Sequence, residues 1–173
     1  MSHVIPKRDV AVRIRFDTGD EQSGRVFLDF IDVIHRGEQT LLDKFNDDYH
    51  WFPLRRDDGS MHIVNRDRIV LVEPGDDLPS GLVRKESGGA FRRESVAVAF
   101  ADDGENLEGQ IAMDLPDEFC RASDFLNFPQ DFFPLETPDG PVLVAKRHVT
   151  ALRVLEAPPA APGLSDAHVG GSG

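Results

Sequence analysis

The sequence predicts a mainly β protein that consists of two tandem five-stranded small barrels with short helical turns. The first observation is a repeat. Residues 45–59 (FNDDYHWFPLRRDDG) and 126–140 (LNFPQDFFPLETPDG) align without a gap at their Asn, Pro-Leu and Asp-Gly positions. The second observation is that apolar and polar residues alternate in short stretches around both segments, a pattern typical of strands with one buried face.

The first two strands of each predicted unit form a hairpin. The opening strand begins at Val10 in the first unit and at Val96 in the second, and a turn that contains Asp and Gly follows each of them. The second strand starts after Gly24 or Gly109. Because side chains alternate faces along a strand, the predicted inward residues are Val26, Leu28, Phe30, Ile111, Met113 and Leu115.

An irregular stretch with a short helical turn is expected next, at 31–46 and 116–127. The repeated segment then supplies the third strand, which ends at Asp-Gly, since glycine allows the positive φ of tight turns. The predicted fourth and fifth strands are residues 60–64, 69–73, 141–145 and 152–156.

These elements predict two domains, at 9–74 and 92–156. The residues between them, 75–91, are rich in Gly, Pro, Ser and charge and are predicted to be a linker. The tail, 157–173, lacks periodic apolar residues and is predicted to be disordered. A unit of about 65 residues is marginally stable alone, so we expect the two units to dock on each other.

The third strands carry adjacent aromatic residues, Trp51-Phe52 and Phe132-Phe133. One ring of each pair must lie on each face of its strand. We therefore expect one ring to fill the core. The other is covered by the irregular segment, by the other repeat or by a partner. For Trp51 itself, packing in the core is the favoured interpretation.

The hairpin openings (FDTGDEQSGRVFLDF and FADDGENLEGQIAMDL) and the turns before the last strands (VNRDRIVLV and AKRHVTALRV) resemble those of Sm-like and SH3-like small barrels. The resemblance covers about 65 residues of each unit and concerns topology. Sm-like barrels bind RNA as rings, which implies an RNA-contact role for Asn65, Arg66 and Arg68. SH3-like barrels imply a protein-binding module.

Composition limits the functional classes. The net charge of −12 disfavours a general nucleic-acid or anionic-membrane binder. No apolar run is long enough for membrane insertion, and the single cysteine, Cys120, excludes an intramolecular disulfide framework. A cytoplasmic location is expected from these features.

One spacing has metal-ligand chemistry. Asp29, Asp32 and His35 recur as Asp114, Asp117 and Cys120. These groups can bind a divalent metal, but loop carboxylates that bond locally or to water are the favoured interpretation. The sequence contains no phosphate-binding glycine loop and no Ser-His-Asp signature. We therefore expect no cofactor and no enzymatic activity.

The sequence thus predicts a protein-protein interaction module, an adaptor or scaffold. Alanines alternate on the opening strand of the second unit, where the first unit has arginines, and suit close packing. The predicted partner-binding residues are Tyr49, Trp51, Phe52, Arg55, Phe132, Phe133, Ala97, Ala99 and Ala101. An Sm-like RNA-binding protein and a small-ligand or metal-sensing regulator are the alternatives. The predicted partner is another protein, and a homo-oligomer is left open.

Overall fold

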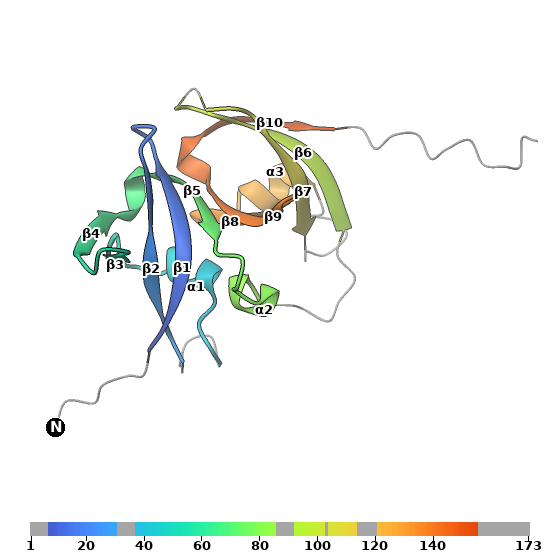
Figure 1. The fold of residues 1–173 in the computed structure, drawn as a ribbon. Coiled ribbons are helices and arrows are strands. Elements are labelled where there is room, and N and C mark those ends of the chain that lie inside the picture. Colours follow the sequence, from blue (N-terminus) through green and yellow to red (C-terminus); the bar gives the residue numbers. More distant parts are fainter. Residues whose placement is uncertain (1–6, 31–36, 86–91, 103, 114–120, 156–173) are drawn as a thin grey trace, which may run out of the picture.

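The computed structural model describes residues 7–30, 37–85, 92–102, 104–113 and 121–155 (Figure 1). In this part of the chain, ten strands form a single antiparallel sheet, and three short helices accompany it. The predicted mainly β class is confirmed. The two separate barrels are not confirmed, because the described strands form one continuous sheet that is not closed on itself.

The first half of the sheet contains strands β1 to β5, and the second half contains β6 to β10. The first-half elements are β1 (Lys7–Phe16), β2 (Glu21–Asp29), α1 (Leu41–Phe45), β3 (Trp51–Arg56), β4 (Met61–Asn65), a 3₁₀ turn η1 (Arg66–Arg68) and β5 (Ile69–Pro74). Helix α2 (Ser80–Val83) follows. The second-half elements are β6 (Arg92–Phe100), β7 (Leu107–Met113), α3 (Ala122–Leu126), β8 (Phe132–Thr137), β9 (Gly140–Ala145), η3 (Lys146–His148) and β10 (Val149–Val154).

Strand order shows that the two halves repeat one topology. The order across the sheet is β10-β6-β7-β8-β9-β5-β1-β2-β3-β4. Each half therefore places its fifth strand beside its first, followed by its second, third and fourth strands. The halves join where β9 pairs with β5, with Val72 opposite Leu143 and Leu71 opposite Val144. We call this pairing the internal junction. It leaves β4 and β10 at the two ends of the sheet.

Hydrogen bonds define equivalent residues in the two halves. The Arg66 amide donates to the His50 carbonyl at 2.7 Å, and the Lys146 amide donates to the Asp131 carbonyl at 2.9 Å. The third strand and the 3₁₀ turn therefore correspond, but the β8–β9 hairpin is one residue shorter, since Thr137 already pairs with Gly140. The sequence prediction that the two Asp-Gly pairs align without a gap is therefore wrong, because the two hairpin turns differ by one residue.

The opening strands also align differently from the sequence prediction. Gly24 pairs with Val12, and Gly109 pairs with Val96. Val96 is thus the counterpart of Val12, two residues further along than Val10. A shift of two residues keeps every side chain on its predicted face, so the inward and outward assignments of β1 and β6 survive the correction.

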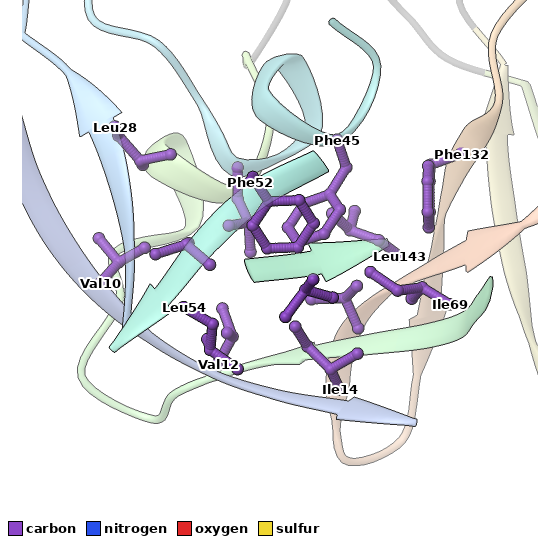
Figure 2. Close-up of a cluster of buried hydrophobic side chains, with 14 of the residues drawn as sticks. Val10, Val12, Ile14, Leu28, Phe45, Phe52, Leu54, Ile69, Phe132 and Leu143 are labelled. Carbon is purple, nitrogen blue, oxygen red and sulfur yellow. The ribbon is translucent and has the colours of Figure 1, made fainter. Parts of the chain in front are cut away.

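Two hydrophobic cores lie on the sheet, and both contain residues from both halves, since Val70 and Leu71 of β5 belong to the core of the second half. Phe132, Leu143 and Ala145 of the second half belong to the core formed by β1 to β5. Figure 2 shows Phe132 and Leu143 beside Phe45, Phe52 and Ile69. The Phe45 ring lies edge-on to Phe52 and to Phe132, at 5.3 Å between centroids in each case. The predicted docking of the two repeats is therefore a shared core.

Short helical elements complete this core. Helix α1 begins with a capping box, in which the Thr40 hydroxyl accepts from the Asp43 amide and the Asp43 carboxylate accepts from the Thr40 amide. This cap fixes Phe45 over the sheet. The predicted linker contributes α2, whose Leu82 and Val83 are buried. No helix among the described residues is long and apolar enough to cross a membrane. The predicted disordered tail lies outside those residues.

Candidate protein-binding surface

The outer face of the β3–β4 hairpin carries a cluster of exposed apolar side chains. Strand pairing sets Pro53 opposite Ile63 and Arg55 opposite Met61, so these side chains share one face with Trp51. The exposed fractions are 71% for Tyr49, 60% for Trp51, 51% for Met61 and 62% for Ile63. We call these four residues the β3–β4 surface. Exposed apolar residues gathered in this way mark interaction sites.

The centre of the equivalent face in the second half is buried. Phe132 occupies the position of Trp51 and is 2% exposed, and Leu143 occupies the position of Ile63 and is 0% exposed. Both pack into the core of the first half. The same face of the same unit is thus covered by protein in one copy and open in the other.

The other ring of each aromatic pair behaves as the sequence predicts. Phe52 and Phe133 are buried in the first and second cores. Phe132 is covered by the other repeat, one of the three predicted alternatives. Trp51 is exposed, so the expectation that it packs in the core is wrong. The reason is positional, since β4 ends the sheet and no described strand follows it.

Arg55 lies on the same face of the hairpin as Trp51. Its guanidinium is ion-paired with Asp9 and lies 5.5 Å from the centroid of the Phe27 ring. Arg25 also approaches Asp9, at 3.9 Å. These contacts hold a charged rim beside the apolar cluster, which is the usual composition of a protein interface.

The predicted RNA-contact residues are engaged inside the chain. Arg66 is 4% exposed, and its guanidinium donates to the Phe45 carbonyl at 3.2 Å and to the Asp47 carbonyl. The Asn65 side chain accepts from the Asp67 amide at 3.0 Å, and Arg68 pairs with Asp17 at 2.7 Å. Arg66 is therefore a structural residue that holds the end of α1.

Burial shifts the pKa values of two charged residues that follow or contact the short helices. Burial raises the pKa of Asp47, and the hydrogen bond from the Tyr49 amide opposes that rise. In the second half, Lys146 takes the place of Arg66 and donates to the Phe128 carbonyl at 2.7 Å. Burial lowers the pKa of Lys146, and Asp131 opposes that change. Both halves thus use a cation to hold the chain after the short helix.

A polar cluster around Asp67 bridges the two halves. The Asp67 carboxylate lies 3.0 Å from Nδ1 of His50 and 2.9 Å from Arg147. Nε2 of His148 lies 2.7 Å from the Asp67 carbonyl oxygen. The His50 hydrogen bond is the main cause of a lowered pKa for Asp67, and Arg147 adds to it.

The structure groups no metal ligands among the residues it describes. Asp29 pairs with Lys7 at 3.7 Å, and its amide donates to the Gln39 side chain at 3.1 Å. The remaining candidates lie outside the described residues; they are Asp32, His35, Asp114, Asp117 and Cys120.

The predicted alanine face lies next to an edge of the sheet. Ala97 pairs with Arg153 and Ala99 pairs with Ala151 of β10. Ala97 is buried, Ala99 is half-buried and Ala101 is exposed. These residues therefore line the strand that neighbours β10 and do not belong to the β3–β4 surface.

Sequence reasoning missed Met61 and Ile63. Their exposure has no signal in the sequence. In the fourth strand, SMHIV, Met61 and Ile63 alternate with polar residues, and such alternation places apolar side chains on the buried face. Comparison of this chain with protein-family models, curated proteins and solved structures finds no match.

Proposed function

We propose that this protein is a non-catalytic protein-binding module, an adaptor or scaffold, that binds through the β3–β4 surface. The observation that carries the proposal is the contrast between Trp51 and Phe132, which are 60% and 2% exposed at equivalent positions. In the second half this face packs on protein, whereas in the first half it is open. A tryptophan exposed on such a face is typical of the residues that anchor protein interfaces. Tyr49 and Arg55 beside it are residue types enriched in interfaces.

We also propose that each half is one small-barrel unit that stays open because its neighbour occupies its edge. The shared strand order supports this view, as does the short pairing between the second and third strands in both halves. The module therefore offers its partners sheet edges and curled faces.

The test is affinity capture with the full chain as bait, followed by mass spectrometry. Truncating a central aromatic anchor costs ~2 kcal/mol or more of binding free energy. Trp51→Ala should therefore reduce the amount of captured partner about tenfold or more. Phe30→Ala is the matched control, since Phe30 is also an exposed aromatic residue and lies outside the surface. Equal capture by the wild type and by Trp51→Ala would remove the proposal.

A further inference from the structure

The internal junction has an inserting side and a receiving side. The inserting side is the β8–β9 face, which contributes Phe132 and Leu143 to the core of the first half. The receiving side includes Phe45, and Asn46 holds the inserted strand. The side-chain amide of Asn46 donates to the main-chain carbonyl of Phe132 at 3.1 Å. Its side-chain oxygen accepts from the main-chain amide of Phe132 at 2.8 Å.

The inserting side exists a second time, unoccupied by any described residue. It is the β3–β4 surface, in which Trp51 and Ile63 stand at the positions of Phe132 and Leu143. Strand β4 also forms an end of the sheet, and its sequence, MHIVN, contains no Lys or Pro. Proteins commonly protect exposed edges with such residues. Both the face and the edge are therefore suited to pairing.

The receiving side is also present twice. Leu126, Val149 and Leu152 of the second half stand at the positions of Phe45, Ile69 and Val72. The three residues of the first half are fully buried, whereas their counterparts are only partly buried. The burial that Phe45, Ile69 and Val72 gain from the inserted β8–β9 face is therefore missing in the second half.

Asn127 repeats the position of Asn46, and no described strand lies against it. It is exposed, and its side-chain amide donates at 2.9 Å to the Ser123 carbonyl of its own helix. Asn127 follows α3 as Asn46 follows α1. Because Asn46 binds both main-chain groups of the inserted aromatic residue, Asn127 can do the same for Trp51 of another chain.

Charge complementarity supports the same arrangement. Across the internal junction, Asp67 of the first half pairs with Arg147 of the second. These two residues occupy equivalent positions in their halves. A junction between two chains therefore brings Arg147 of one copy to Asp67 of the next, with the roles exchanged. The ion pair of Arg66 with Asp131, at 3.3 Å, has no counterpart, since the equivalent residues are Lys146 and His50.

We propose that the partner of the β3–β4 surface is a second copy of this chain, which adds its β4 edge to β10 of the first copy, head to tail. The inference rests on the proposed function and names the partner of the same site. Trp51 of the second copy packs against Leu126, Val149 and Leu152, and Asn127 bonds to its main chain. The register of the internal junction places Ile63 opposite Leu152, and Val64 opposite Ala151.

This contact joins two different surfaces. Each copy keeps one free surface of each kind, so further copies add until the assembly closes as a ring or extends as a chain. The assembly is thus built from the same junction that already joins the halves within one chain.

The first test measures mass by light scattering after size exclusion. The chain has a mass of 19.2 kDa, and we expect wild-type assemblies of at least twice that value. Ile63→Asp on the inserting side and Leu152→Asp on the receiving side should each give monomers. An equimolar mixture of the two variants should recover dimers, because each variant keeps the surface that the other lacks. Failure of the mixture to recover dimers would overturn the head-to-tail arrangement.

Leu152 is partly buried, so its substitution also risks unfolding the chain. Asn127→Ala changes an exposed residue on the same side and avoids this risk. In the proposed junction, Asn127 makes two hydrogen bonds to the main chain of Trp51. Losing both should raise the dissociation constant of self-assembly about tenfold or more. An unchanged dissociation constant for Asn127→Ala would contradict the receiving role of α3.

The second test traps the register by disulfide formation. Directly opposed residues in antiparallel strands lie within disulfide range. In a Cys120→Ser background, Ile63→Cys mixed with Leu152→Cys should form a cross-linked dimer. Ile63→Cys mixed with Val154→Cys is the matched out-of-register control and should form little. Equal cross-linking in both mixtures, or cross-linking of Ile63→Cys with itself, would overturn the proposed register.

The outcomes separate this inference from the proposed function. A wild-type chain that stays monomeric at high concentration, yet captures another protein in a Trp51-dependent manner, would refute self-assembly and retain the binding module. A chain that neither assembles nor captures a partner through Trp51 would refute both.

Discussion

Trp51 and Phe132 occupy the same position in two copies of one unit and have opposite environments. Phe132 packs edge-on against Phe45 inside the first core. Trp51 lies at the end of the sheet, where the structure describes no further strand. Burial of each ring therefore depends on whether another strand lies beside its hairpin in the sheet. The residue type, Trp or Phe, has little influence on it.

This contrast predicts different effects on stability. Phe132→Ala should lower the free energy of unfolding by ~3–5 kcal/mol, the cost of truncating a buried aromatic residue. Trp51→Ala should change it by only ~0.5 kcal/mol, as at most surface positions. Urea denaturation in dilute solution, where the chain is monomeric, measures both. Similar losses for the two variants would show that Trp51 is buried within the chain.

Asp67 predicts a pH dependence at the same scale. Its pKa is lowered, chiefly by the hydrogen bond with His50. A lowered pKa in the folded state gives stability that is present above the unfolded value of 3.8 and is lost as the pH falls through the folded value. The side chain is partly exposed to solvent, which screens the interaction, so the contribution is modest, at ~0.5 kcal/mol.

The corresponding experiment compares the wild type with Asp67→Asn by thermal unfolding. The wild type should be more stable at about pH 5, and the difference should shrink as the pH falls below the unfolded value of 3.8 and the carboxyl group becomes protonated. A difference that persisted at the lower pH would assign the effect to packing instead of charge.

At the scale of the element, two equivalent glycines set the bend of the second strand. A Cβ atom on Gly24 would lie 2.6 Å from the Arg55 carbonyl oxygen, and one on Gly109 would lie 2.6 Å from that of Glu136. Only glycine allows the second strand to cross the third so closely. The sequence shows both glycines, but the reason for them is visible only once the strands cross.

Gly109→Ala should therefore destabilise the protein by ~1–3 kcal/mol, because the backbone of β8 must move. Gly81→Ala is the matched control, since a Cβ atom at Gly81 meets open space. Chemical denaturation distinguishes the two. Equal stability of both variants would mean that β7 and β8 can separate without cost.

At the scale of the whole molecule, one sheet runs through both halves. Strands β5 and β9 lie at its centre and are mostly buried, whereas β4 and β10 lie at its ends. In the dilute monomer, hydrogen exchange should be slowest in β5 and β9, because only global unfolding exposes them. It should be fastest in β4 and β10.

Exchange mass spectrometry on peptides from these four strands checks this expectation. At concentrations where the chain assembles, β4 and β10 should both become protected. Slow exchange limited to one half would indicate two independently stable units and contradict the shared core.

The sequence alone determined the repeat, the β class and most strand positions, because alternation of apolar residues and glycine-containing turns act locally. It also indicated Tyr49 and Trp51, from their type, as candidate contact residues, and the structure exposes both. The pairing of β9 with β5, the one-residue difference between the hairpins and the exposure of Trp51 beside the burial of Phe132 were decided by the tertiary structure. These features depend on which edge each strand meets, and contacts between residues far apart in the chain leave no periodic signal in the sequence.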